Sequence, residues 1–217
     1  MEASDIIELL KQSSSPAYRE GMLRFGIDNS NALGVRIPDL RKLAKVIKID
    51  HSLAQQLWDT NVHEAKLLAT MIDDPKLVTG QQIDEWTLSF DSWDICDQAC
   101  SNLFARTPFA IEKAIEYCNR EEEFVKRAGF VIMAAFSVHD KKADDMVFIK
   151  FMPIIEREAN DERNFVKKAV NWALRQIGKR NGALKQVAIA TGERILQQNN
   201  KAAKWIANDA LRELRSR

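Results

Sequence analysis

Apolar residues recur at three- and four-residue spacing along nearly the whole chain, and almost no segment alternates apolar and polar residues. The first pattern is typical of amphipathic helices and the second of strands. We therefore expect an all-α protein of a dozen or so helices with short connections. Pro38-Asp39 predicts one helix start, with proline at the first helical position. Asp91-Ser92-Trp93-Asp94 predicts another, in the form of a capping box. The one long loop expected is Gly26–Gly34.

The helical period also predicts which residues are buried in two of these helices. In the helix from Asp91 the solvent face is expected to carry Asp94, Gln98 and Ser101, and the buried stripe is Ile95, Cys96, Ala99 and Leu103. In the helix from Phe165 the expected buried stripe is Val166, Ala169, Val170, Ala173 and Ile177.

A repeat appears late in the chain. Phe124-Val125-Lys126-Arg127-Ala128 is echoed 41 residues later by Phe165-Val166-Lys167-Lys168-Ala169, and more loosely 40 residues after that at Trp205. This period suits HEAT-like helix pairs stacked as a solenoid. We expect residues 1–217 to form a single HEAT-like repeat domain, a curved α-solenoid with a concave basic groove. Equivalent positions such as Arg127 and Lys168 should then project on one side.

Composition and charge narrow the class of protein. Hydrophobic residues make up 46% of the chain, so composition gives no case for disorder. Neither a signal peptide nor an apolar run of roughly 18 residues is apparent, which predicts a cytoplasmic protein. Three cysteines form no disulfide framework, and three scattered histidines lack metal-ligand spacing, so we expect no metal.

The net charge of +1 hides a strong asymmetry. Residues 163–217 carry 13 Lys and Arg against three acids, a net of +10, whereas residues 1–162 have a net of −9. This asymmetry indicates either a polyanion contact made by the last quarter of the chain or a solvated helical surface that is basic without a partner.

Trp93 and Asp97 are one helical turn apart. They lie about 40° from each other around the helix, at the border of its buried and solvent faces. Asp94 is explained by capping, but Asp97 is not. In one interpretation Trp93 is a half-buried packing residue and Asp97 an ordinary surface acid. In the other, both side chains line a groove, where an electron-rich ring and a carboxylate suit a cationic ligand.

Two further features suggest chemistry. Trp172 lies within a basic stripe, which a phosphate-tracking surface with one apolar contact would need. The stripe comprises Lys168, Trp172, Arg175 and Lys179, with Arg180 following. Arg127 lies in an otherwise apolar helix, so its guanidinium must reach a carboxylate, a phosphate or solvent, and a buried structural salt bridge is the alternative.

Together these motifs resemble the AlkD-type DNA alkylation repair family, HEAT-like DNA glycosylases that remove positively charged alkylated purines. The resemblance runs through nearly the whole chain. It rests on four motifs in order: 34–45 (GVRIPDLRKLAK), 92–97 (SWDICD), 125–128 (VKRA) and 165–175 (FVKKAVNWALR). One departure is Ser92, where the family often has a second aromatic.

The resemblance implies a function and a set of site residues. Asp97 matches the family's essential carboxylate, Trp93 and Trp172 its two tryptophans, and Arg127 its active-site arginine. The expected DNA-binding residues are Lys168, Arg175, Lys179 and Arg180. The implied protein is a monomeric, cofactor-free, monofunctional glycosylase that excises N3- or N7-alkylated purines from double-stranded DNA. A catalytically silent HEAT-like module that binds DNA, or a protein-binding scaffold, is the alternative.

Overall fold

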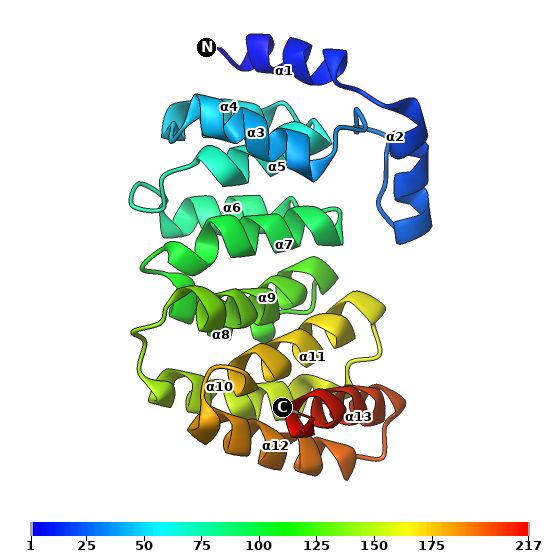
Figure 1. Cartoon of the computed structure of the whole chain (residues 1–217), viewed down its shortest axis with the longest axis vertical. Coiled ribbons are helices and arrows are strands. Elements are labelled where there is room, and N and C mark those ends of the chain that lie inside the picture. Colours follow the sequence, from blue (N-terminus) through cyan, green and yellow to red (C-terminus); the bar gives the residue numbers. More distant parts are fainter. Residues whose placement is uncertain (1, 217) are drawn as a thin grey trace. The chain divides into compact units, whose positions relative to one another are not determined.

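The computed structural model describes residues 2–216, and within them every regular element is a helix (Figure 1). This confirms the all-α prediction and the expected number of helices. The α-helices are α1 (Ala3–Gln12), α2 (Pro16–Met22), α3 (Ile37–Ile47), α4 (His51–Asp59), α5 (His63–Ile72), α6 (Gly80–Leu88), α7 (Trp93–Asn102), α8 (Ala110–Cys118), α9 (Glu123–His139), α10 (Asp145–Arg157), α11 (Asn164–Gly178), α12 (Gly182–Leu196) and α13 (Lys201–Arg215). Three 3-10 helices join them: η1 (Leu23–Phe25), η2 (Phe104–Arg106) and η3 (Glu158–Asn160).

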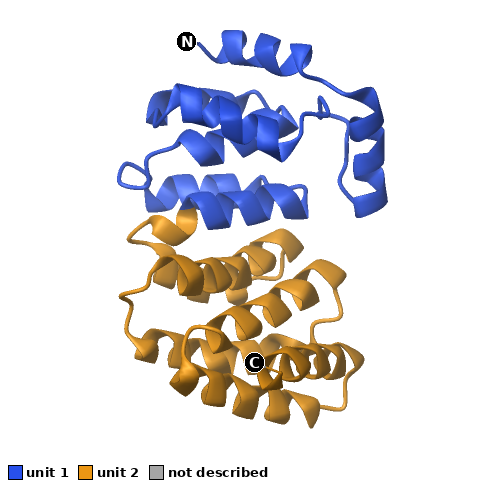
Figure 2. Cartoon of the chain, in the orientation of Figure 1, with its two compact units in different colours: residues 1–103 blue, residues 104–217 orange. Residues whose placement is uncertain are grey.

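The chain divides into two compact units, residues 1–103 and residues 104–217 (Figure 2). The division leaves the expected single domain over residues 1–217 a prediction. The charge asymmetry follows the division, because the first unit has 10 Lys and Arg against 16 acids, a net of −6, and the second has 22 against 15, a net of +7.

The first unit is built around α5, whose residues are nearly all buried because α3, α4 and α7 pack against it. Trp58 and Trp86 stack beside it, with ring centroids 3.8 Å apart and planes 3° from parallel. The loop before α3 is fixed by Glu64 of α5, whose buried carboxylate accepts the backbone N–H groups of residues 33–35. Gly34 in that loop has φ +84°, and a Cβ there would lie 2.3 Å from the Ser15 carbonyl oxygen.

The second unit is built around α9, which packs against α8 on one side and α11 on the other. Gly129 allows the close approach of α8, because a Cβ at this position would lie 2.7 Å from the Cys118 Sγ. The repeat in the sequence corresponds to contacts between equivalent positions of α9 and α11. Phe124 of α9 and Phe165 of α11 occupy equivalent positions and touch, with ring centroids 5.6 Å apart.

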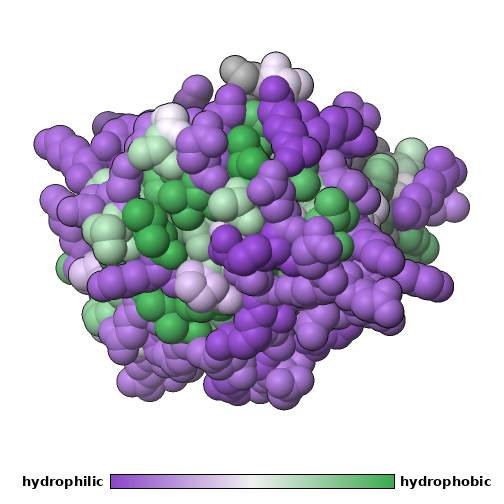
Figure 3. All heavy atoms as spheres, turned by 90° about the horizontal axis from the view of Figure 1, so that it is seen from below, coloured by the Kyte–Doolittle hydropathy of each residue, from purple (hydrophilic) through white to green (hydrophobic). Residues whose placement is uncertain are grey.

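Burial follows the predicted stripes. Every residue of the two expected stripes is buried, at an exposure of at most 1%. The three cysteines are buried thiols, as small core residues are. No helix among residues 2–216 is long and apolar enough to cross a membrane. Figure 3 shows one face of the molecule, on which hydrophilic side chains predominate and apolar ones form separate patches.

Candidate functional site

The start of α7 differs from the capping box expected at Asp91. The helix begins at Trp93 with Ser92 as its N-cap, and the Ser92 side chain makes no capping hydrogen bond. Asp94 is not at the N3 position, and its two oxygens have other partners. Oδ1 accepts the Ile95 N–H at 3.0 Å, and Oδ2 lies 2.8 Å from His63 Nε2. The prediction failed because Asp94 is held by a residue 31 positions earlier, which no local pattern reveals.

Trp93 is half-buried at the N-terminus of α7, and its ring has a fixed place. Its indole Nε1 donates a 3.0 Å hydrogen bond to the Phe25 carbonyl oxygen. Its apolar edge packs against the buried cluster of Met22, Ile27 and Ala32. The loop between α2 and α3 therefore packs against the ring and accepts the hydrogen bond of its N–H group. Trp93 is thus a half-buried packing residue, and part of its ring stays accessible to solvent.

Asp97 lies one turn further along α7 and is also half-buried. Its neighbours Cys96, Ala99 and Cys100 are fully buried in the first unit. The side chain thus sits at the border between the buried and exposed faces of α7, as its position around the helix predicted. A carboxylate at such a border is partly removed from water, which strengthens its attraction for a nearby cation.

The carboxylate of Asp94 and the imidazole of His63 form a polar link between α5 and α7. His63 is 5% exposed. Burial acts to lower the pKa of His63, but the hydrogen bond and charge of Asp94 outweigh it and hold this pKa above its usual value. The link engages the carboxylate nearest to Trp93 in the packing of the first unit.

In the second unit, α11 carries the predicted basic stripe, but its members differ in their surroundings. Lys168 is exposed, and Trp172 is half-buried four residues later. Arg175 and Lys179 share the carboxylate of Glu213 on α13, at 2.7 and 3.1 Å. These two cations are therefore partly neutralised within the unit.

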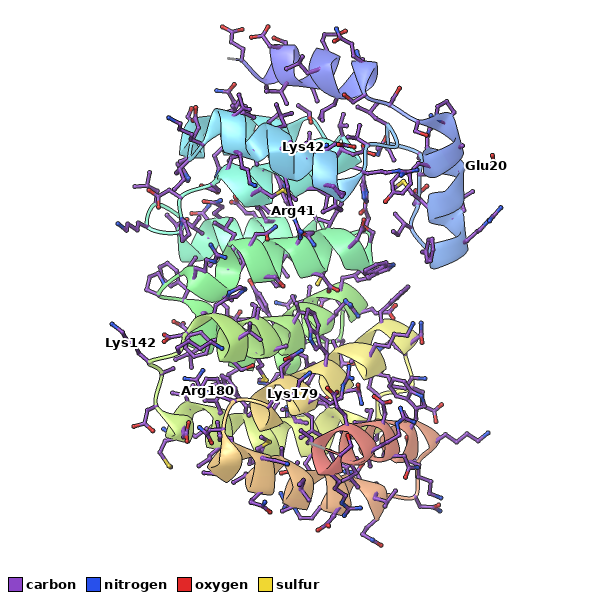
Figure 4. All side chains as sticks on the ribbon, viewed as in Figure 1. Glu20, Arg41, Lys42, Lys142, Lys179 and Arg180 are labelled. Atoms are coloured by element: carbon purple, nitrogen blue, oxygen red, sulfur yellow. The ribbon has the colours of Figure 1, made fainter. Side chains whose placement is uncertain are left out.

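The Arg180 side chain is buried among other residues of the second unit. Figure 4 shows it with Lys179 just beyond the end of α11. Its side chain is only 7% exposed. Its guanidinium donates 2.9 Å hydrogen bonds to the carbonyl oxygens of Ser137 and Ala143, and it lies 4.4 Å from the ring centroid of Phe148. These contacts connect Arg180, just after α11, to α9, to the loop that follows α9 and to α10, so the guanidinium supports the packing of the second unit.

Arg127 is buried, at 5% exposure, whereas Lys168 at the equivalent position of the next repeat is exposed. The two equivalent positions therefore differ in burial, and their projection on one side stays a prediction. The Arg127 guanidinium donates to the Phe165 carbonyl oxygen at 2.5 Å and lies 6.0 Å from the Phe165 ring centroid. The reason for the difference is the next helix: α11 supplies an aromatic ring and a carbonyl that take up the guanidinium.

Sequence reasoning missed several residues that shape these sites. Phe25 supports Trp93 from 68 positions away, and Glu213 neutralises Arg175 from 38 positions away. The one signal that could have found such partners is the repeat itself. A period of about 40 residues predicts that side chains of one helix meet those roughly one period later, as Lys167 meets the Trp205 ring, with 5.2 Å between its Nζ and the ring centroid.

Comparisons with known proteins bear on the whole chain. The family described as DNA alkylation repair enzyme matches residues 6–214. Two curated relatives, Lin0241 of Listeria innocua serovar 6a and Lmo0209 of Listeria monocytogenes serovar 1/2a, are 25% and 23% identical over 108 residues. Both matches cover 48% of this chain and 48% of the relative, so they span about half the length of each.

A solved structure shares the fold. It is described as a new family of proteins related to the HEAT-like repeat DNA glycosylases with affinity for branched DNA structures. The TM-score is 0.82, with 98% of this chain and 95% of that chain covered. Sequence identity is 17%, so the likeness shows the fold alone. The HEAT-like repeat fold expected from the 40-residue period is thereby confirmed.

Proposed function

The chain belongs to the DNA alkylation repair enzyme family, and from that premise we propose that it is a monofunctional DNA glycosylase acting on N3- or N7-alkylated purines in double-stranded DNA. The observation that carries the proposal is the arrangement on α7. The Trp93 ring is held by the Phe25 carbonyl, and the Asp97 carboxylate lies one turn away at the helix border. A fixed ring beside a partly desolvated carboxylate is a preorganised site for a cation.

The chemistry needs few groups. A purine alkylated at N3 or N7 carries a positive charge, so its glycosidic bond is weakened and the leaving base needs no proton. This differs from sugar hydrolysis by paired carboxylic acids, in which one acid protonates the leaving group. As the bond breaks, positive charge develops on the deoxyribose. The Asp97 carboxylate would stabilise that charge and orient the attacking water.

The Trp93 ring would hold the cationic nucleotide. A cation against an indole ring gains about 0.5–2 kcal/mol, and the Trp93 ring has one part packed on the loop and another part accessible. Trp172, half-buried on α11 of the second unit, would offer an aromatic ring of its own to the DNA. Helix α7 contains no lysine that could form a Schiff base with the sugar, which favours a monofunctional enzyme without strand cleavage.

The second unit would contribute most of the contact with the DNA backbone. Its net charge of +7 suits a polyanion, and Lys168 is exposed on α11. Arg175 and Lys179 would reach phosphates by exchanging one carboxylate, that of Glu213, for a phosphate. Arg127, whose guanidinium donates to the Phe165 carbonyl, would add a positive charge that attracts a flanking phosphate.

Release of free base from methylated duplex DNA tests the proposal, comparing wild type with Asp97→Asn by chromatography. We expect wild type to release 3-methyladenine or 7-methylguanine, and Asp97→Asn to be slower by about 10²–10³ with DNA binding retained. Asp91→Asn is the matched control, because Asp91 is exposed one residue before the N-cap and should behave as wild type. Loss of DNA binding together with activity in Asp97→Asn would contradict the catalytic role.

A second candidate function is DNA binding without excision. The solved structure with the same fold is described as having affinity for branched DNA, and the charge of the second unit would serve such binding equally well. This candidate predicts tighter, salt-sensitive binding to a three- or four-way junction than to a linear duplex of equal length, with no base released by the wild type.

A further inference from the structure

The second unit contains a pocket of about 430 Å³ at the C-terminal end of α9. Its wall is formed by residues 105–107 at η2, by Phe136 and His139 of α9, and by residues 140–142 of the loop that follows α9. None of these residues has a role in the proposed function. The volume lies within the range of about 300–1,000 Å³ that is usual for ligand pockets. The pocket is therefore large enough for a ligand of its own.

The pocket carries an excess of positive charge. Arg106, Lys141 and Lys142 are exposed, and none of the three forms an ion pair among residues 2–216. Asp140 contributes the one carboxylate among the described residues of the wall, and its Oδ1 accepts the N–H groups of residues 142 and 143, each at 2.9 Å. With His139 neutral, three cations against this one acid leave a net charge of +2. Cations without a carboxylate partner in the protein are available to an anionic ligand.

The loop after α9 is held at both ends. The Arg180 guanidinium donates 2.9 Å hydrogen bonds to the carbonyl oxygens of Ser137 and Ala143, the residues on either side of segment 138–142. The Ser137 carbonyl belongs to the last turn of α9, whose negative end would otherwise repel an anion. Arg180 therefore fixes the loop and also offsets this repulsion, so that less ordering is needed when a ligand binds.

His139 reports the electrostatic field inside the pocket. Its pKa is lowered by burial first, and then by the charges of Arg106 and Lys141. The two cations are therefore close enough to the imidazole to disfavour its protonation. A negative charge bound beside them would act in the opposite sense and raise this pKa. The ring thus provides a direct measure of whether an anion occupies the pocket.

We propose that this pocket binds a phosphate group. A phosphate offers more acceptor oxygens than a carboxylate does, which suits cations that approach from two separate segments, η2 and the loop after α9. The Arg106 guanidinium can donate to two phosphate oxygens at once, whereas Lys141 and Lys142 supply compact point charges. The combination of one planar donor and two point charges favours phosphate as the ligand.

The DNA backbone is one source of that phosphate, and for this source the inference rests on the proposed function. Arg127 and His139 are 12 residues apart on α9, which corresponds to about 18 Å along the helix. Phosphates of one DNA strand follow one another at about 3.4 Å along the duplex axis. A duplex that runs along α9 would therefore bring a phosphate to the pocket about five nucleotides from the one attracted by Arg127. A small phosphate-bearing molecule is the other source.

The test follows the imidazole Cε1 proton of His139 by NMR in the full chain, near pH 6.5, where a raised pKa moves the signal toward its protonated position. Inorganic phosphate is compared with chloride at equal ionic strength, and an unmodified DNA duplex of about ten base pairs is the second probe. With phosphate we expect a saturable shift of His139 that chloride does not produce. Replacing both lysines, Lys141→Gln together with Lys142→Gln, should raise the midpoint concentration about tenfold.

Lys150→Gln is the matched control, because Lys150 is exposed on α10 of the same unit and does not line the pocket. It should behave as wild type. If neither phosphate nor the duplex moves the His139 signal, the proposal is overturned, and an equal weakening in Lys150→Gln and in the double lysine variant overturns it as well. An unchanged thermal unfolding midpoint of the double variant shows that misfolding is not the cause of a loss.

The two probes separate the two sources of phosphate. A His139 shift with the duplex, and a slope of log DNA affinity against log salt lowered by about 2 in the double lysine variant, identify the DNA backbone. A shift with inorganic phosphate alone identifies a small phosphate-bearing ligand. Base release by the wild type is measured in parallel, so that failure of the phosphate pocket in an active enzyme is distinguished from failure of the proposed glycosylase.

Discussion

The indole Nε1 of Trp93 donates a 3.0 Å hydrogen bond to the backbone carbonyl of Phe25, a residue 68 positions earlier in the chain. This bond joins the first residue of α7 to the last residue of η1. It fixes the ring that we propose to contact the alkylated nucleotide.

Trp93→Phe removes this hydrogen bond and keeps an aromatic ring. We expect unfolding in urea to show a loss of about 0.5–1.5 kcal/mol, the usual net contribution of one hydrogen bond. Base release should slow as well, because the smaller ring is no longer oriented by the loop. Trp205→Phe is the control, since Trp205 is 43% exposed on α13 and its ring contact with Lys167 survives the change. Wild-type stability and activity in Trp93→Phe would show that the bond does not position the ring.

The sequence was sufficient for features that depend on local periodicity. The buried stripe of α7 and that of α11 follow from residue spacing alone, because each helix must turn one face to the core. Asp97 could be placed at the border of that face for the same reason. The 40-residue repeat predicted the HEAT-like packing, and the contact of Phe124 with Phe165 is its direct result.

Contacts between helices that are far apart in the chain could not be predicted from the sequence. Arg180 looked like one more cation of a basic stripe, but its guanidinium bonds to carbonyls 43 and 37 residues away. The local sequence predicted a capping role for Asp94, but one of its carboxylate oxygens is instead hydrogen-bonded to His63. In each case tertiary hydrogen bonding decides what the side chain does.

Glu64→Gln should destabilise the protein strongly. The Glu64 carboxylate is 1% exposed and accepts three backbone N–H groups, at 2.8, 2.6 and 3.1 Å, from the loop that leads into α3. Gln removes the charge and turns an N–H group toward at least one of these donors, so we expect a loss of about 2–4 kcal/mol in urea unfolding. Glu85→Gln, an exposed change in the same unit, should stay within about 0.5 kcal/mol. A small effect at Glu64 would mean that the loop is held by other contacts.

The His63–Asp94 link predicts how stability depends on pH. The pKa of His63 is raised in the folded protein, so the folded state binds the proton more tightly than the unfolded state. The stabilisation is therefore fully present below the ordinary histidine pKa of about 6.5, and it is lost as pH rises through the higher folded pKa. Urea unfolding between about pH 6 and about pH 8.5 should show this loss in wild type and not in His63→Gln.

His139 must be removed from that comparison because it acts in the opposite sense. Burial, Arg106 and Lys141 lower the pKa of His139, so stability rises with pH up to the ordinary histidine pKa of about 6.5, which overlaps the lower end of the range measured for His63. The measurement is best made in a His139→Gln background. If stability in that background does not fall with pH, or if His63→Gln leaves the fall unchanged, the link does not titrate as we expect.

Lys168 and Arg180 give a matched pair that separates DNA contact from structural support on α11 and the segment after it. Lys168 is exposed, whereas the Arg180 side chain is 7% exposed and bonded to two carbonyls. Lys168→Gln should weaken duplex binding, lower the slope of log affinity against log salt by about 1, and leave stability unchanged. Arg180→Gln should instead cost about 2–3 kcal/mol of stability with the salt slope intact, because the lost partners lie inside the protein. Fluorescence anisotropy over a salt series measures the salt slope, and urea unfolding of each variant measures stability. A lowered salt slope in Arg180→Gln and a lost stability in Lys168→Gln would show that Arg180 is the phosphate contact.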